Sequence, residues 1–303
     1  MKGTQTQGYI QVFSAGFLWG TVGIWATLLG RMGMDSMNTA FFRLLSATVI
    51  LFIVLVIKGK GFSLFKISKR GLISCILIGF ISQGFYNFFY MYSVQNSGMS
   101  TAAVLLYTAP IFVAVLSRIF LKEEITGNKI IAIVINILGC ILTVTGGSLA
   151  GAMISSKGII FGVLAGLTYA LMPILGRIGA DEENPFTTAF YGLAFAGLLL
   201  FFMARPFTGI DFEFTPQAIL VIIAYGLIPS ALGYIIYFGG LGKITETSVI
   251  PIFTSVENVA AAAFGFLIFH EAFTPVKVIG VALVFVSIIV MNIRKRIEVN
   301  STK

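Results

Sequence analysis

Long, continuously apolar stretches separated by short polar connections form the main pattern along the chain. A membrane-spanning helix needs about 20 mostly apolar residues, whereas transmembrane β-strands alternate in polarity over about ten residues. The continuity of the stretches excludes a closed barrel. The pattern predicts an all-α integral membrane protein with ten transmembrane helices, near residues 10–30, 38–57, 71–93, 99–121, 128–147, 157–177, 187–204, 217–238, 247–269 and 275–293.

The second half of the chain repeats the first at an offset of 148–150 residues, which indicates a duplication. Because each copy holds an odd number of helices, the second copy enters the membrane from the opposite face. We therefore predict two inverted five-helix repeats, residues 1–151 and 152–303, an architecture of secondary transporters whose site lies where the repeats meet. The aligned segments are TAFFRLLSATVILF (39–52) with TAFYGLAFAGLLLF (188–201), AGFLWG (15–20) with AGLTYA (165–170), and EEITGNKII (123–131) with EAFTPVKVI (271–279).

The composition agrees with a membrane protein. Hydrophobic residues make up 57% of the 303 residues and charged residues 11%, with a mean hydropathy of +0.98, whereas soluble domains carry about 25% charged residues. Cys75 and Cys140 both lie in apolar segments, so neither a disulfide framework nor a metal site is indicated, and no cofactor is expected. The first apolar run is interpreted as an uncleaved span, with a signal peptide as the alternative.

The net charge of +8 is interpreted as an orientation signal. Ten spans place both termini on one side, and fifteen of the 20 lysines and arginines fall on that side. Arg31, Lys157, Arg205 and Lys277 fall on the opposite side, and Arg43 lies inside a span. The positive-inside rule then places both termini in the cytoplasm and the protein in the cytoplasmic membrane. No nucleic-acid partner is needed to explain the charge.

Three features carry a resemblance to a known family: AGFLWG in the first helix, Arg43 in the second, and STAAVLLYTAPIFVAVLSRIFLKEEIT (100–126). Together with the ten spans, they resemble the EamA family of the drug/metabolite transporter superfamily. One departure is Asn258, which aligns with Pro110 where the family often repeats the proline; Pro251 lies two turns earlier. The resemblance implies transport of a small organic solute, often an amino acid or a related metabolite, commonly coupled to an ion gradient.

Polar residues recur on one face of the third helix at positions i, i+3, i+4 and i+7. Polar groups avoid lipid, so this face should contact the bundle interior or a wet cavity, and interhelical hydrogen bonding is the competing interpretation. For the aromatic candidates, packing competes with solute binding, and for Pro110 a simple kink competes with a carbonyl freed for a site. The candidates are Gln83, Tyr86, Asn87 and Tyr90 on this face, and Trp19, Tyr107, Tyr234 and Asn258 elsewhere.

Arg43 is the charge that the repeat does not conserve, because its counterpart is Gly192. It lies about five residues from the outer end of its helix, roughly 8 Å deep at 1.5 Å per residue, so its side chain could snorkel to the interface. Charges inside a membrane usually face the interior and often mark a pathway. We expect Arg43 to line the outer half of a pathway and to pair with an anionic group.

Glu257 lies about ten residues from either end of the ninth span, too far for a short carboxylate to reach the interface. Insertion scales assign roughly 2.5–3.5 kcal/mol to an acidic residue at the bilayer centre, so a partner, water or a proton must offset that cost. One interpretation is a neutral glutamate that holds helices together. The other is a residue that binds a cationic group or carries a coupling proton, because desolvation favours its neutral form and a cation its charged form.

The predicted function is secondary active transport of a small organic solute, in the direction of export, with protons as a candidate coupling ion. A membrane enzyme is disfavoured because no clustered His, Asp, Glu or Cys offers ligand spacing. A channel or a translocator of lipids or precursors stays open, since both can use polar helix faces. Glu123 and Glu271 precede the predicted N-caps Thr126 and Thr274 and are assigned to turn formation.

Overall fold

The computed structural model describes residues 2–59, 62–148, 155–180, 183–206, 212–270, 272 and 274–301, and this described part contains helices and no strand. The predicted boundary at 151/152 lies outside the described residues. The first half contains α1 (Lys2–Trp19), α2 (Val22–Arg31), α3 (Ser36–Lys58), η1 (Ser63–Phe65), α4 (Lys69–Leu77), the π-helical η2 (Ile78–Phe85), α5 (Tyr86–Leu106), α6 (Ala109–Leu121) and α7 (Gly127–Thr145). The second half contains α8 (Ser156–Leu175), the π-helical η3 (Gly176–Ala180), α9 (Pro185–Ala204), α10 (Pro216–Tyr225), the π-helical η4 (Gly226–Leu232), α11 (Gly233–Leu241), η5 (Thr247–Val249), α12 (Ile250–Thr254), α13 (Val256–Phe269) and α14 (Pro275–Ser301).

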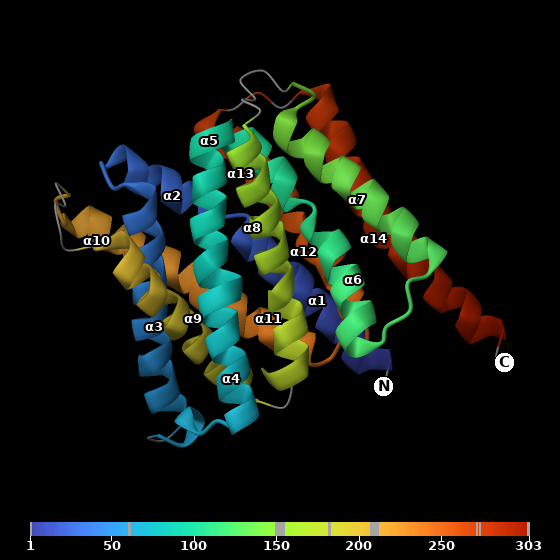
Figure 1. Cartoon of the computed structure of the whole chain (residues 1–303), viewed down its shortest axis with the longest axis horizontal. Helices are drawn as coiled ribbons and strands as arrows, with labels where there is room; N and C mark the ends of the chain where they lie inside the picture. The colour runs from blue at the N-terminus through green and yellow to red at the C-terminus, as the bar shows by residue number, and fades with distance from the viewer. Residues whose placement is uncertain are drawn as a thin grey trace.

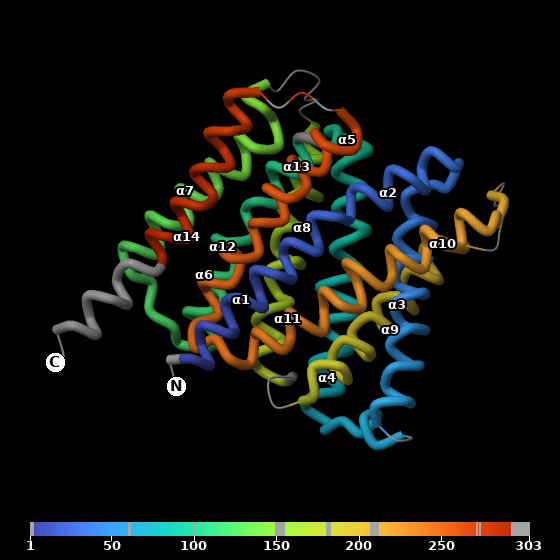
Figure 2. The backbone as a smooth tube through the Cα atoms, turned by 180° about the vertical axis from the view of Figure 1, so that it is seen from behind, coloured from blue at the N-terminus to red at the C-terminus, as the bar shows by residue number. Residues whose placement is uncertain are grey.

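Within the described residues, nine helical stretches are long and apolar enough to cross a membrane, and a shorter apolar helix covers Pro275–Met291. The all-α, ten-helix prediction is confirmed, with two differences in extent: the first stretch begins at Gly3, and the third continues to Met99. Figures 1 and 2 show the start of α1 and the α3–α4 connection at one end of the bundle, toward which α14 runs. We call this the terminal end, and the opposite end, which carries the α2–α3 connection, the distal end.

Side-chain caps set where several helices begin. Asp35 accepts hydrogen bonds from the backbone amides of Met37 and Asn38 at 3.0 Å, which satisfies two of the free donors of α3. The predicted cap at Thr126 is confirmed, because its hydroxyl accepts the amide of Lys129. Asn184 and Thr215 cap α9 and α10 in the same way, each followed by a proline at the first helical position.

The two halves share irregular features at matching positions. The π-helical segments η2 and η4 begin 148 residues apart, at Ile78 and Gly226. Helices α6 and α13 both end on a residue in the left-handed conformation, Lys122 with φ 57° and His270 with φ 55°. The duplication therefore extends to backbone geometry, and π-helical segments are frequently found at functional sites.

Three of the predicted spans are broken near mid-depth. The break between α5 and α6 lies at residues 107–108, immediately before Pro110, and the break between α12 and α13 lies at Ser255, 148 residues after Tyr107. The ninth predicted span, residues 247–269, therefore breaks at the matching position although Asn258 replaces the proline. Pro251 at the start of α12 and the Ser255 hydroxyl, which donates to the Ile252 carbonyl at 2.7 Å, accompany the break.

The first span differs from the continuous helix that the sequence predicts, because α1 ends at Trp19 and α2 begins at Val22. The connection crosses α13 closely: a Cβ atom on Gly20 would lie 2.7 Å from the carbonyl oxygen of Glu257. Small residues allow helix backbones to approach in this way. The matched helix α8 continues unbroken through the corresponding residues, so the break belongs to one copy alone.

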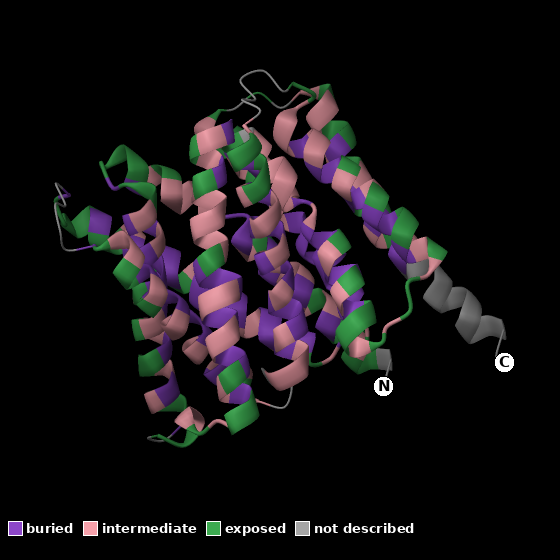
Figure 3. Cartoon of the chain, viewed as in Figure 1, coloured by how far each residue is buried: buried purple, intermediate pink, exposed green. Residues whose placement is uncertain are grey.

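Buried residues concentrate in the middle of the bundle, as Figure 3 shows in purple. Helices α7 and α14 lie side by side along one edge (Figures 1 and 2). Gly139 and Gly280 allow this contact: a Cβ on Gly139 would lie 2.8 Å from the Val284 amide nitrogen, and one on Gly280 would lie 2.5 Å from that of Thr143. Helices α1, α2, α3, α5, α8, α10, α11 and α13 contribute residues to the central cavity described next.

Candidate functional site

A cavity of about 440 Å³ lies between the two halves. Its lining runs from Trp19 at the α1–α2 break to Met34, Ser36 and Met99 near the distal end. Nine of the ten residues selected from the sequence line it, and the tenth, Tyr107, donates a hydrogen bond from its hydroxyl to the Asn258 side-chain oxygen at 2.7 Å. The nine are Trp19, Arg43, Gln83, Tyr86, Asn87, Tyr90, Tyr234, Glu257 and Asn258.

Arg43 projects from α3 into this cavity and is only 9% exposed. Its guanidinium lies over the ring of Tyr225, 5.5 Å from the centroid, in a cation–π contact. Its buried Nε has no hydrogen-bond partner, and among the described residues no carboxylate forms an ion pair with it. A buried guanidinium that lacks an anionic partner is an electrostatic site for an anionic group of a ligand.

Glu257 lies in the first turn of α13, directly after the Ser255 break. The sequence placed it in the middle of an unbroken helix, and the structure changes its surroundings, because a helix N-terminus stabilises a negative charge. Its carboxylate lines the cavity, and no hydrogen bond or ion pair of this carboxylate occurs within the described part of the chain. Tyr86 and Tyr234 line the same cavity as Arg43 and Glu257.

The polar face of the third span serves both roles that the sequence left open. The Gln83 side chain is 2% exposed; its oxygen accepts the Tyr234 hydroxyl at 2.6 Å, and its nitrogen donates to the Met172 sulfur at 3.1 Å. Asn87 donates to the Gln83 backbone carbonyl at 2.6 Å, at the end of the π-helical segment. Interhelical hydrogen bonds therefore fix Gln83, which also lines the cavity.

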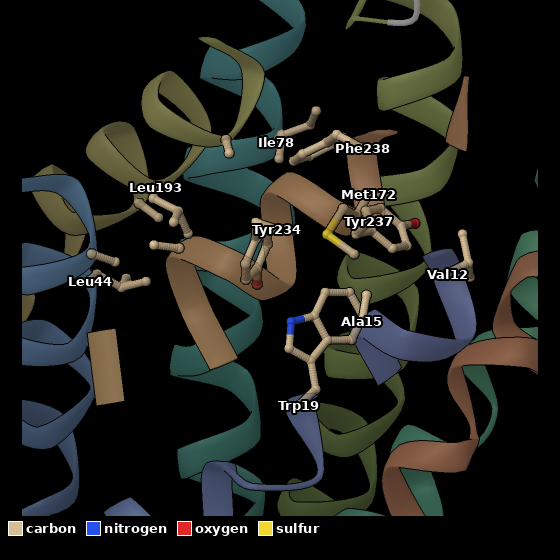
Figure 4. Close-up of a cluster of buried hydrophobic side chains, with 14 of the residues drawn as sticks. Val12, Ala15, Trp19, Leu44, Ile78, Met172, Leu193, Tyr234, Tyr237 and Phe238 are labelled. Carbon is tan, nitrogen blue, oxygen red and sulfur yellow. The ribbon is translucent and has the colours of Figure 1, made fainter. Parts of the chain in front are cut away.

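Aromatic rings form the floor of the cavity. The Trp19 ring lies 5.3 Å from that of Tyr234 and 5.1 Å from that of Tyr237, centroid to centroid, and Figure 4 shows it directed toward these two tyrosines. The buried indole nitrogen of Trp19 has no hydrogen-bond partner. On the terminal side of Trp19, only about 10 Å³ of space is left between Trp19, Val113, Tyr169 and Thr254, among others, which is about the volume that one water requires.

Two aromatic residues of the lining were not among those selected from the sequence. Tyr169 aligns with Trp19 in the repeat; its ring lies 5.3 Å from that of Tyr86, and it lines the cavity. Tyr225, which contacts Arg43, carried no signal, because the residue matched to it at the 148-residue offset, Leu77, is not aromatic. Only the fold brings α3 and α10 together.

The terminal end is closed by polar contacts between the halves. The Glu123 carboxylate accepts the backbone amides of Thr247 at 2.5 Å and Ser248 at 3.0 Å, and the Ser248 hydroxyl at 2.6 Å. We call this interaction the Glu123 cap, because it satisfies free donors at the start of the ninth span. The sequence assigned Glu123 to its own turn, and the structure adds this second role; Glu271 lies outside the described residues.

Further contacts reinforce this closure. Lys129 forms an ion pair with Glu246 at 3.6 Å and donates to the Glu124 carbonyl at 2.7 Å. Lys243 donates to the Gln11 side chain at 2.7 Å, across the two halves. The cavity therefore approaches the distal end and is sealed at the terminal end.

Comparison with known proteins gives a consistent result. The family model described as the EamA-like transporter family matches residues 6–145 and again residues 156–293. An uncharacterized transporter of Clostridium kluyveri is 25% identical over 94% of this chain and 92% of its own length. The uncharacterized transporter YxxF of Bacillus subtilis is 23% identical over 94% and 89%, and the uncharacterized inner membrane transporter YicL of Salmonella typhimurium is 23% identical over 97% and 98%.

One solved crystal structure shares the fold, with a TM-score of 0.78 at 14% identity, covering 94% of this chain and 97% of that chain. The same family model matches once in each half, as the duplication requires, and the relatives align over most of their length. The protein is a multi-pass membrane transporter for small molecules, and it belongs to the EamA-like transporter family.

Proposed function

We propose that this transporter is a secondary active carrier that exports a small organic solute, an amino acid or a related metabolite, across the cytoplasmic membrane by alternating access. The observation that carries the proposal is the central cavity itself. Among the described residues that line it, Arg43 is the cationic one and Glu257 the acidic one, and neither has an ion-pair partner within the described part of the chain; the cavity is sealed at one end. A solute with both an anionic and a cationic group matches this arrangement.

In this proposal Arg43 holds the anionic group of the solute. A guanidinium can donate two parallel hydrogen bonds to a carboxylate. The contact with the Tyr225 ring fixes the orientation of the Arg43 guanidinium. The free indole N–H of Trp19 is a further donor in the floor. Glu257 holds the cationic group or, in the absence of solute, a proton, and competition between the two couples solute movement to proton movement.

Alternating access follows from the inverted repeat, since two inverted copies can exchange conformations and so open to each side in turn. The positive-inside rule supports a cytoplasmic terminal end. The structure then corresponds to a state sealed toward the cytoplasm by the Glu123 cap and the aromatic floor. The matched π-helical segments η2 and η4 and the matched breaks at residues 107 and 255 are the irregular points at which the two copies could bend.

A channel is the second candidate, because the polar faces of a pore and of a carrier can look alike. The sealed terminal end favours the carrier, since Trp19, Tyr234 and Tyr237 fill the path below the cavity. A lipid translocator needs a continuous path for the lipid head group. The closed aromatic floor interrupts such a path in this state.

The test is counterflow in proteoliposomes. Vesicles loaded with one unlabelled amino acid should take up the same labelled amino acid transiently above equilibrium, with saturable rates, after a thermal-shift screen of purified protein against amino acids, amines and sugars selects the solute. Everted vesicles driven by a proton gradient then give the direction. Flux that rises linearly with concentration and shows no counterflow would establish a channel.

A further inference from the structure

A second cavity, of about 300 Å³, opens beside the central one between α2, α13 and the α7–α14 pair. We call it the side cavity. It adjoins the central cavity, because five residues line both. These are Gly20, Gly23, Met99, Asn258 and Ala261.

The wall between the two cavities is thin because its residues are small. Gly20 and Gly23 supply no side chain from the α1–α2 segment, and Ala261 supplies only a methyl group from α13. Ala262 and Gly265, which line the side cavity alone, continue the row of small residues along α13. A group bound in the central cavity can therefore extend sideways into the space between α2 and α13.

The chemistry of the side cavity differs from that of the central one. Ile24, Val144, Phe264 and Phe269 contribute apolar surface. Among its polar members, the Thr143 hydroxyl donates to the Gly139 carbonyl at 2.8 Å, and Asn258 bonds to Tyr107 and to the Cys140 sulfur. Thr27 and Lys277 complete the polar part of the lining. Apolar contact area therefore makes up most of the lining.

The matching place in the other half is closed. At an offset of 148, Ala261, Ala262 and Gly265 correspond to Val113, Ala114 and Ser117, which are 1%, 6% and 0% exposed. Val113 packs with Ala170 and Ile174 in a small buried cluster. The side cavity thus lies toward the distal end, where the central cavity is open, and the matching place toward the terminal end is closed. This difference ties the side cavity to the conformational state rather than to loose packing of the whole fold.

We propose that the side cavity binds the apolar part of the transported solute. The solute is then amphipathic: its charged groups lie between Arg43 and Glu257, and a hydrocarbon or aromatic group lies between α2 and α13. This inference rests on the proposed function, because it assigns a second part of the same solute. An apolar cavity of about 150 Å³ holds a benzene molecule, so 300 Å³ accommodates a side chain of that size or larger.

The experiment uses the tryptophans of the protein. The chain contains two, so Trp25→Phe leaves Trp19, in the floor of the cavity, as the single fluorophore. Purified full-length protein in nanodiscs is titrated with unbranched L-2-amino acids from alanine to 2-aminooctanoate. The dissociation constant should fall roughly fourfold for each added methylene, since burial of one CH₂ contributes about 0.8 kcal/mol.

Ala262→Phe fills the side cavity from a position that does not itself line the central cavity. It should leave the alanine affinity within twofold of the parent and abolish the gain with chain length. Ala263→Phe is the matched control, because Ala263 neighbours it on α13 and lines neither cavity; this variant should keep the fourfold steps. Thermal unfolding of each variant verifies that it is folded.

The outcomes separate the two proposals. Short amino acids that bind without any chain-length gain, or a gain that survives Ala262→Phe, would overturn the side-cavity assignment and leave the carrier for charged solutes intact. If no member of the series binds the parent, the proposed solute class fails and the side-cavity assignment fails with it. Nanodiscs of brominated phosphatidylcholine provide the lipid arm: quenching of Trp19 that Ala262→Phe removes, without a chain-length gain, assigns the cavity to bilayer lipid and overturns the proposal.

Discussion

Single residues carry most of the functional argument, and Arg43 is the clearest case. Its helix needs no charge at that position, because the second copy has Gly192 there and still forms a helix. Snorkelling to the interface would leave the side chain exposed, yet Arg43 is 9% exposed and stacks on Tyr225. The side chain is therefore held inside the bundle by contacts that direct it into the cavity.

Replacing Arg43 should abolish recognition of the anionic group. Hydrogen bonds to charged groups contribute about 1.5–3 kcal/mol, so Arg43→Ala should weaken solute binding roughly ten- to hundredfold. Arg43→Lys should recover only part of it, because the ammonium lacks the planar fork. Binding is measured by thermal shift and uptake in proteoliposomes, at matched expression, with the lipid-facing Leu45→Ala as control. Normal transport by both Arg43 variants would reduce the residue to an anchor.

Glu257 should carry the coupling. Glutamine keeps the size and hydrogen-bonding capacity of the side chain but cannot exchange a proton, so Glu257→Gln should eliminate accumulation driven by a proton gradient. The measurement is solute uptake against its gradient in proteoliposomes with an imposed pH difference. Glu246→Gln is the matched control, because that carboxylate lies in the partly exposed ion pair with Lys129 and should remain coupled. A Glu257→Gln variant that still accumulates solute would exclude the residue as the coupling site.

At the scale of elements, the notable contacts are those that a helix in one half makes with the other half. The Glu123 cap joins the end of α6 to the start of the ninth span through three hydrogen bonds. These bonds exist only while the terminal end is closed, since opening must separate the two elements. The cap therefore stabilises one conformation relative to the other.

Weakening the cap should increase the population that is open at the terminal end. Glu123→Gln replaces one accepting oxygen with a donor, which removes about 1.5–3 kcal/mol of charge-assisted hydrogen bonding. In a Cys75→Ala/Cys140→Ala background, Thr254→Cys reports on the small space below Trp19. Its labelling by a water-soluble maleimide from the terminal side should accelerate at least tenfold in Glu123→Gln. Glu124→Gln, one residue away and exposed, should leave the rate unchanged; equal rates in both variants would contradict the role of the cap.

The sequence predicted the elements well where hydropathy alone decides them. The ten spans, the caps at Thr126 and Thr274 and the duplication all rest on local composition or spacing. The break at Gly20 was not predictable in this way, because no proline marks it and its cause is the close approach of α13. The second role of Glu123 was hidden for a similar reason: a local turn explained the residue equally well, and Thr247 is 124 positions away.

The candidate site was predicted more completely than these elements. Polar residues inside apolar segments are few, and each needs an interior partner, so selecting them also selected the lining of the cavity. Tyr225 and Tyr169 escaped because aromatic residues suit lipid, packing and binding alike. The functional roles of the lining residues remain predictions that the variants above are designed to test.

For the whole molecule, orientation is the property to establish first. In the cysteine-free background, Leu64→Cys in the basic α3–α4 connection should react with an impermeant maleimide only from the cytoplasmic side. Met32→Cys, 40% exposed as methionine and located in the α2–α3 connection, should react only from outside. Labelling of intact cells and of everted vesicles gives both answers, and a reversed pattern would contradict a cytoplasmic terminal end.

The unequal distribution of charge between the copies has a consequence for how such a carrier can be built. Arg43 matches Gly192, and Glu257 matches Ala109, 148 residues earlier, so each copy retains one charge and has a small neutral residue in place of the other. Two identical five-helix subunits in a homodimer would instead bring two guanidinium groups and two carboxylates into one chamber. Fusion into a single polypeptide lets the subunits diverge, so that the proposed site would hold one dipolar solute for each chain.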